Sequence, residues 1–179
     1  LTKIGCPILL TVHGEGIMEV APMLVAVAED VFIAGLSCAA NRDGLDQVLP
    51  VLDRSGVKEV HVMELPTILD SFESGGEFHV DMVISPVDDR KVLVWPQNLP
   101  YETYKWLRER RFEIIEIAAE DQGYCPANLV LLEPGKVIMA KGAVETVRRV
   151  ERAGVEVIAI DTDGIQLGGV NGISCITGQ

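Results

Sequence analysis

The chain has 179 residues, of which 48% are hydrophobic, and its formal net charge is −12 from 27 acidic and 15 basic residues. This composition indicates a globular protein with a sizeable core, and it argues against a nucleic-acid partner, because phosphate backbones are bound by clustered lysine and arginine. No apolar run approaches the roughly 20 residues of a membrane-spanning helix, so we expect no membrane partner.

In chain order, one pattern of elements occurs three times. An extended segment is expected first, over residues 8–19, 77–85 and 126–132. A polar turn and an apolar strand follow, within 28–37, 88–97 and 133–142. Helices are predicted next over 42–55, 101–110 and 143–153, since apolar residues recur there at helical spacing. A closing strand follows each helix, within 57–65, 111–118 and 154–161. Gly56 and Gly154 lie where a helix C-cap favours glycine.

These elements predict an α/β fold made of three ββαβ repeats in a single domain over residues 1–179. Each copy presents one apolar sheet face and one apolar helix stripe, so neighbouring copies should pack against one another. An ordinary doubly wound α/β domain is the alternative, and the extra leading strand of each repeat fits it poorly.

Four polar residues stand out against their surroundings as candidate site residues. Glu19 lies in the leading segment of the first repeat, and His79 and Asp81 lie in that of the second. Two residues apart on a strand, His79 and Asp81 would point to one face. Cys175 lies on a glycine-rich loop near the C-terminal end. A structural His–Asp pair and an inert thiol remain the alternatives.

A cysteine, a histidine and carboxylates together are the parts needed for covalent catalysis, with the thiolate as nucleophile and the imidazole as general acid and base. No metal is expected, because the sequence has no CxxC or HxxxH pair. Four widely spaced cysteines in a core-rich chain indicate reduced thiols and a cytoplasmic protein. Cys125 is interpreted as structural, although it occupies the place of a site-facing loop in its repeat.

The sequence resembles the guanidino-group modifying superfamily with the pentein fold: arginine deiminases, amidinotransferases and dimethylargininases. "HVDMVISPVDDRKVLVWP" is similar to the histidine strand of that family, and "GGVNGISCITG" to its terminal loop with the nucleophilic cysteine. "MEVAPMLVAVAEDVFIAGLSCAANRDG" is similar to the segment that opens with Glu-Gly-Gly-Asp and ends in a Gly-Leu-Ser turn before a helix. The three motifs occur in the family's order.

The resemblance implies a role for each candidate. Cys175 would attack a guanidinium carbon and form a thiouronium adduct, and His79 would act as general acid and base. Asp81 and Glu19 would hold guanidinium nitrogens through charge-assisted hydrogen bonds. No cofactor is implied.

Two further residues, Asn41 and Gly169, are expected to contact substrate, although Asn41 also fits a simple helix-entry role. Pro22 stands where the family often has a second carboxylate, and Ser174 where histidine is common.

The family fold is a fan of five units, and three are counted here. We expect the chain to be the C-terminal portion of a longer or cleaved protein, or a reduced variant that self-associates; the first is favoured because the chain starts without methionine. Another polypeptide or copy would supply the missing repeats. The predicted function is guanidino hydrolysis through Cys175. Amidino transfer with the same nucleophile and a catalytically degraded binding module are the alternatives.

Overall fold

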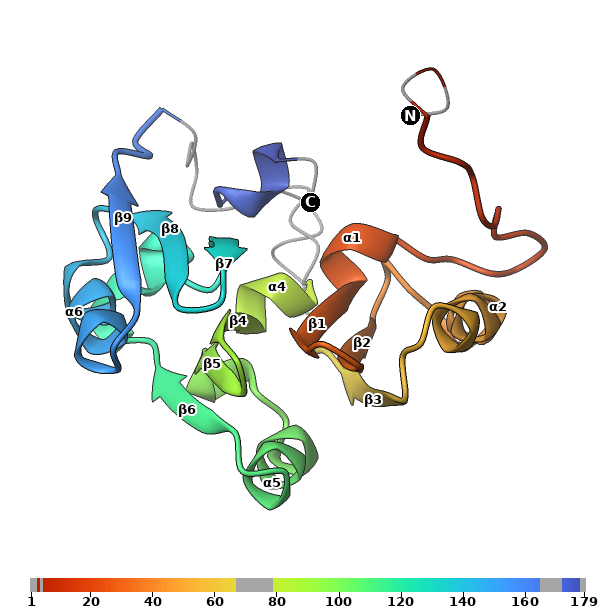
Figure 1. Cartoon of the computed structure of the whole chain (residues 1–179), viewed down its shortest axis with the longest axis horizontal. Helices are drawn as coiled ribbons and strands as arrows, with labels where there is room; N and C mark the ends of the chain where they lie inside the picture. The colour runs from red at the N-terminus through yellow and green to blue at the C-terminus, as the bar shows by residue number, and fades with distance from the viewer. Residues whose placement is uncertain (1–2, 4, 67–78, 165–171, 178–179) are drawn as a thin grey trace.

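The computed structural model describes residues 3, 5–66, 79–164 and 172–177. Within them, three sheets of three strands follow one another along the chain, each with its own helix (Figure 1). In each sheet the first strand pairs antiparallel with the second, and the second pairs parallel with the third. The α/β class and the three-fold ββαβ repeat are therefore confirmed.

The first unit comprises a one-turn helix, two hairpin strands, a long helix and a closing strand: α1 (Val20–Met23), β1 (Leu24–Ala28), β2 (Val31–Leu36), α2 (Arg42–Arg54) and β3 (Glu59–Glu64). The leading strand predicted over 8–19 is wrong, because the run that pairs with β2 is the later apolar stretch Leu24–Ala28. Residues 8–19 contain Gly14 and Gly16 and form only an isolated bridge, from Met18 to Ala40.

The second unit repeats this order, with a short 3-10 turn before its helix: α4 (Val80–Val83), β4 (Ile84–Asp88), β5 (Lys91–Val94), η2 (Pro96–Asn98), α5 (Tyr101–Glu109) and β6 (Glu113–Glu116). His79 and Asp81 do not lie on a strand, as the sequence had indicated. His79 is the N-cap of α4, and Asp81 is in its first turn. The helical turn is favoured because it buries both Val80 and Val83, three residues apart.

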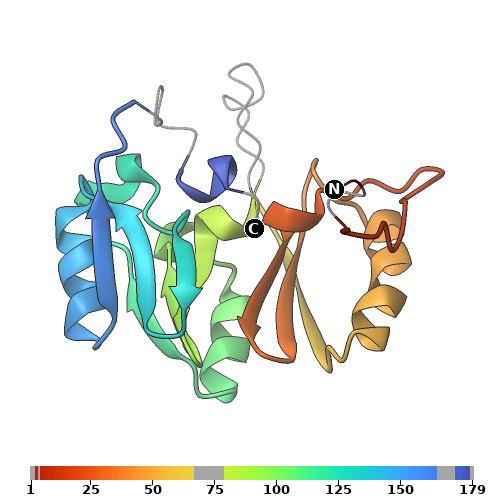
Figure 2. The ribbon, with the colours of Figure 1, turned by 45° about the horizontal axis from the view of Figure 1, so that its top comes forward.

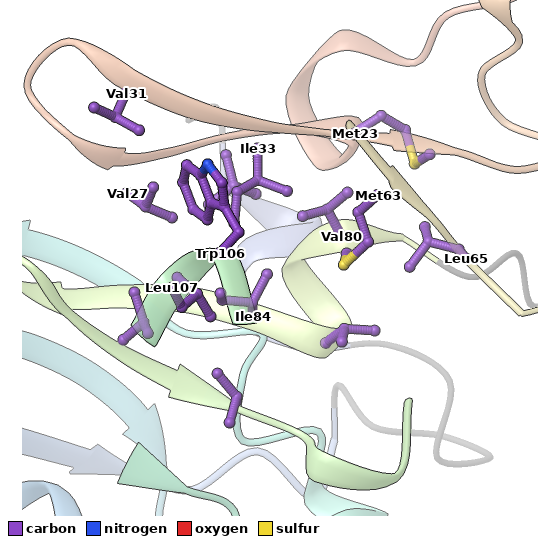
Figure 3. Packing of buried hydrophobic residues seen from close by; sticks show 14 of the residues in the cluster. Met23, Val27, Val31, Ile33, Met63, Leu65, Val80, Ile84, Trp106 and Leu107 are labelled. Carbon is purple, nitrogen blue, oxygen red and sulfur yellow. The ribbon is translucent and has the colours of Figure 1, made fainter. Parts of the chain in front are cut away.

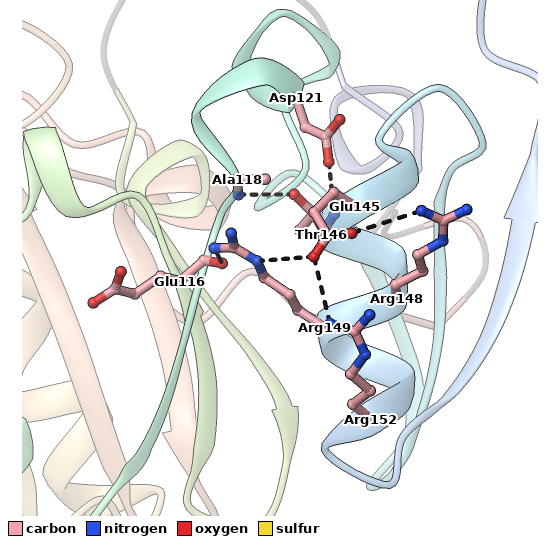
Figure 4. Close-up of polar contacts among 8 residues, drawn as sticks. All are labelled: Glu116, Ala118, Asp121, Glu145, Thr146, Arg148, Arg149 and Arg152. Atoms are coloured by element: carbon pink, nitrogen blue, oxygen red, sulfur yellow. Dashed lines mark hydrogen bonds and ion pairs between the residues drawn. The ribbon is translucent and has the colours of Figure 1, made fainter.

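The third unit follows a 3-10 segment and precedes the C-terminal turn: η3 (Ala119–Tyr124), β7 (Val130–Glu133), β8 (Lys136–Ala140), α6 (Val144–Arg152), β9 (Glu156–Ile160) and η4 (Ser174–Ile176). Its helix is fixed at the N-terminal end by buried polar groups. Asp121 Oδ2 accepts a hydrogen bond from the Thr146 N–H at 2.6 Å, and Thr146 Oγ1 accepts one from the Ala118 N–H at 3.1 Å (Figure 4).

Two apolar clusters join the three units. The cluster between the first and second units includes Met23, Ile33, Val80, Ile84 and Leu107, all fully buried (Figure 3). The cluster between the second and third units is built in the same way, from Val87, Leu93, Val137, Met139 and Val150. Each unit therefore buries an apolar face against its neighbour, as the repeat pattern predicts.

The inner strands β1, β4 and β7 contact one another in series, and this arrangement gathers the leading end of each unit toward one centre (Figure 2). The helices α1 and α4 and the C-terminal turn η4 lie around this centre. No helix in the described part of the chain is long and apolar enough to cross a membrane.

Candidate active site

A cavity of about 820 Å³ opens at this centre, and all four predicted catalytic residues line it. Glu19 comes from the start of α1, His79 and Asp81 from the start of α4, and Cys175 from η4. Residues from three distant parts of the sequence are thus brought to one site. The rest of the lining is mainly apolar and includes Val20, Ala21, Pro22, Leu24, Val25, Ala26, Phe32, Leu52, Pro86, Leu129 and Leu131.

Glu19 and His79 occupy equivalent places in their units, each as the N-cap of a one-turn helix that leads into the inner strand. His79 Nε2 lies 3.1 Å from Glu19 Oε2. The imidazole is therefore paired with a carboxylate from the neighbouring unit, not with Asp81 as its place in the sequence had indicated. This contact holds the imidazole ring in one orientation.

Asp81 forms a different set of contacts. Its Oδ2 accepts hydrogen bonds from Ser174 Oγ at 2.7 Å and from Asn128 Nδ2 at 2.8 Å. Burial raises the pKa of the Asp81 carboxyl, whereas the Ser174 hydroxyl, the nearby charge of His79 and the Asn128 amide act in the opposite direction. The carboxylate is held in place on one side while its Oδ1 stays buried without a hydrogen-bond partner among the described residues.

Cys175 is solvent-exposed and lies on the turn η4, which is attached to the third unit. Ile173, just before the turn, is 4% exposed and donates its N–H to the Asn128 carbonyl at 3.2 Å. Cys175 Sγ lies 3.5 Å from Asn128 Oδ1. Cys175 therefore lines the cavity from a turn that the buried residue Ile173 holds against the third unit.

Asn128 was not among the predicted site residues. It is 2% exposed and contacts both Asp81 and the turn η4, which carries Cys175. The sequence did contain a signal, because Asn128 is the polar residue in the otherwise apolar segment "PANLVLL" that leads into β7. The same reasoning had singled out Glu19 and His79 in the other two units.

Cys125 lies close enough to the site to interact electrostatically with Cys175 and Asp81. Burial raises the pKa of its thiol, and both of those neighbours raise it further. Its backbone is left-handed, with φ of 45°, which is uncommon for a residue other than glycine. Cys125 thus combines a half-buried position with proximity to the predicted nucleophile.

The two predicted substrate-contacting residues have different outcomes. Asn41 is the N-cap of α2: its Oδ1 accepts hydrogen bonds from the N–H groups of Gly44 at 2.8 Å and Ile17 at 2.9 Å. It is not among the residues that line the cavity, so the helix-entry interpretation fits, and contact with substrate stays a prediction. Gly169 lies outside the described residues. Within those residues, no cluster of three or more His, Cys, Asp or Glu side chains is placed to hold a metal ion.

Comparison with known proteins identifies the family to which this chain belongs. A profile of the arginine deiminase family matches residues 13–178. The chain belongs to the arginine deiminase family. This member of the family is 32% identical over 167 residues to a 2-nitroimidazole nitrohydrolase from Mycobacterium sp. (strain JS330), a match that covers 90% of this chain and 44% of that protein.

Solved structures confirm the pentein-type α/β fold of this arginine deiminase family member. A DDAH from Pseudomonas aeruginosa, in complex with citrulline, superimposes with a TM-score of 0.69 at 23% identity, covering 90% of this chain and 55% of that one. An amidinotransferase of saxitoxin biosynthesis from Microseira wollei gives a TM-score of 0.67 at 16% identity, covering 87% and 45%. The chain therefore spans about half the length of these relatives, which include hydrolases and an amidinotransferase.

Proposed function

We propose that this chain carries the catalytic half of a hydrolase that acts on a guanidino-type carbon through a covalent adduct on Cys175. The observation that carries the proposal is the convergence of Cys175, His79, Glu19 and Asp81 on one cavity. These four groups supply a nucleophile, a general acid and base, and two anionic hydrogen-bond acceptors. The family membership supports the same reading.

The chemistry can be written as two displacements. The Cys175 thiolate adds to the planar guanidinium carbon, the tetrahedral intermediate collapses, and the amine leaves with a proton from His79. The product is a thiouronium adduct on sulfur. His79 then takes a proton from water, which adds to the same carbon and expels the thiolate, leaving a urea. If an amine replaces water in the second step, the outcome is amidino transfer.

The carboxylates are suited to holding a cation during both steps. Glu19 is bound to His79 through Oε2, and Asp81 is bound to Ser174 and Asn128 through Oδ2. Asp81 lines the cavity, and its Oδ1 is buried with no hydrogen-bond partner among the described residues. A guanidinium N–H would satisfy this buried acceptor, and charge-assisted hydrogen bonds of this kind fix a planar group for attack.

The lining also favours a second substrate class. Val20, Ala21 and Pro22 present apolar surface where related sequences often carry another carboxylate. The Mycobacterium relative is named for 2-nitroimidazole, whose C2 atom lies between two nitrogens, as a guanidino carbon does. A planar heteroaromatic compound with a displaceable group on such a carbon would therefore suit the same nucleophile.

The remaining units of the fan are proposed to come from another polypeptide or from chain outside these residues. The inner strands β1 and β7 line the cavity with apolar side chains such as Val25 and Leu131, and neither contacts the other closely. A further pair of units would cover these faces and close the site from water. The parts of the substrate that lie away from the reacting carbon would then contact those further units.

The test of the nucleophile is intact-mass spectrometry after treatment with 2-chloroacetamidine, a cationic guanidine-like trap. The protein should be co-expressed with any upstream sequence of its gene. We expect one adduct, on Cys175, which forms at least about tenfold faster than any adduct on the exposed thiols Cys6 and Cys38. Arginine-like compounds should protect it.

The control is Cys175→Ser, in which the fast adduct should be absent while slow labelling of the other cysteines is unchanged. Equal labelling of all exposed thiols in the unsubstituted protein would overturn the catalytic proposal. It would favour the alternative of a binding module that has retained its cysteine.

A further inference from the structure

Asn128 is a buried side chain that contacts both the turn η4, which carries Cys175, and the carboxylate of Asp81. Its Oδ1 accepts the N–H of Ser174 at 2.9 Å and lies 3.4 Å from the N–H of Cys175 and 3.5 Å from its Sγ. Its Nδ2 donates to Asp81 Oδ2 at 2.8 Å. Asp81 lies 47 positions before Asn128 in the chain, and Cys175 lies 47 positions after it. The single Asn128 amide therefore links two distant parts of the sequence.

We propose that Asn128 is a positioning residue that fixes Cys175 relative to Asp81, so that the thiol and the carboxylate can contact the same bound cation. This inference rests on the function proposed for those two residues. Asparagine suits the role because its amide carries an acceptor and two donors in one plane. A carboxylate in its place could not donate to Asp81, and an apolar residue could do neither.

The packing around Asn128 leaves its side chain little freedom to move. Gly172 passes so close that a Cβ at this position would lie 2.2 Å from Asn128 Oδ1 and 2.3 Å from its Cβ. The backbone of Asn128 is held as well, because its N–H donates to the Cys125 carbonyl at 2.9 Å and its carbonyl accepts from Ile173. Gly172 and the buried Asn128 amide therefore allow the C-terminal turn η4 to pack closely against the third unit.

This role predicts an effect on recognition that loss of stability alone would not produce. The cationic trap 2-chloroacetamidine and the neutral 2-chloroacetamide have nearly the same shape. The rate of alkylation by the cationic compound divided by the rate for the neutral one therefore measures how strongly nearby carboxylates attract a cation to a given thiol. In the unsubstituted protein we expect the ratio at Cys175 to exceed that at the exposed thiol Cys38 by about tenfold or more.

Two variants change Asn128 in different ways. Asn128→Leu keeps the branched shape of the side chain and removes every side-chain hydrogen bond, and Gly172→Ala displaces the amide without removing it. In both, the ratio at Cys175 should fall about tenfold, toward that of Cys38. Amide hydrogen exchange of residues 173–175 should also become about tenfold faster or more. Thr146→Val is the matched control: it removes a buried hydrogen bond in the same unit and should lower Tm while leaving the ratio unchanged.

The outcomes separate this inference from the proposed function. An unchanged ratio and unchanged exchange in a folded Asn128→Leu protein would overturn the role of Asn128. The same result in Gly172→Ala would overturn it if the leucine variant does not fold. If the unsubstituted protein already shows the same ratio at Cys175 and Cys38, the cation site itself is wrong, and hydrogen exchange alone then decides whether Asn128 anchors the turn.

Discussion

The buried carboxylate of Asp81 is only partly satisfied by hydrogen bonds. Its Oδ2 is well satisfied by Ser174 and Asn128, but Oδ1 is buried without a partner among the described residues. Because burial raises the pKa of this carboxyl, the charged form is disfavoured in the folded protein. A substrate cation would relieve this cost, so the same feature that destabilises the free protein would strengthen binding.

We therefore expect Asp81→Asn to raise Tm at neutral pH and to lower the preference of Cys175 for the cationic trap about tenfold. The amide oxygen can still accept both existing hydrogen bonds, and the buried charge is gone. Each kcal/mol gained would raise Tm by about 2–4 °C. Thermal unfolding and the two-trap ratio measure the two effects, and a variant that is less stable at neutral pH would contradict this account.

The sign of the pH dependence follows from the raised pKa of Asp81. Between its unfolded and folded pKa values the native state holds more protons, so the stability of the unsubstituted protein rises as pH falls. The Tm advantage of Asp81→Asn should accordingly be largest at neutral pH and shrink as the medium is acidified into that range. An advantage that grows on acidification would show that another group is responsible.

At the scale of elements, the three helix ends show one geometry built with different residues. Gly56 and Gly154, just beyond α2 and α6, have φ of 94° and 86°, as their C-cap prediction requires. The second unit places Arg111 at the corresponding turn after α5, with φ of 61°. A left-handed conformation costs a non-glycine residue about 1 kcal/mol, so this end is strained where the other two are not.

Arg111→Gly should consequently stabilise the protein by a net amount of about 0.5–1 kcal/mol. The relief of backbone strain exceeds the extra entropy that glycine has in the unfolded chain. Arg111 is exposed, and its N–H bond to the Arg108 carbonyl does not need its side chain. Urea unfolding measures the change. The reciprocal control is Gly154→Ala, which should destabilise by a similar amount, and a destabilised Arg111→Gly protein would refute the interpretation of the turn.

These elements also show what the sequence could and could not predict. Helix ends came within about one residue, because α2, α5 and α6 have clear apolar spacing and distinct stops. The one-turn helices α1 and α4 were missed, since four residues contain too little periodicity to separate a turn from a strand. Glu19, His79, Asp81 and Cys175 stood out in the sequence as candidate site residues, and the family resemblance assigned a role to each. The His79–Glu19 pairing depends on how two units pack and was not predictable from spacing.

For the molecule as a whole, the units are joined by polar contacts as well as by apolar packing. Glu59 on β3 of the first unit accepts hydrogen bonds from two residues of the second: Arg110 Nε at 2.8 Å and Trp106 Nε1 at 3.0 Å. Trp106 also stacks on His61, with ring centroids 4.5 Å apart. Arg110 hydrogen-bonds to Glu59 and lowers the pKa of its carboxyl. Because the Glu59 and Arg110 side chains are each about one-third exposed, solvent screens this contact in part.

Glu59→Ala should therefore destabilise the protein by about 1–2 kcal/mol, because it leaves the Trp106 N–H and the Arg110 guanidinium without their partner. The matched control is Glu156→Ala, which breaks a more exposed pair with Lys136 within one unit and should cost no more than about 0.5 kcal/mol.

The stability contributed by Glu59 depends on pH in the opposite direction to that expected for Asp81. A lowered pKa means that the contribution of Glu59 is complete above its unfolded pKa and is lost as pH falls through its folded pKa. Urea unfolding of both variants at neutral and acidic pH tests this, and the difference between unsubstituted protein and Glu59→Ala should narrow in acid. A difference that is independent of pH would mean that Glu59 joins the units through packing and not through its charge.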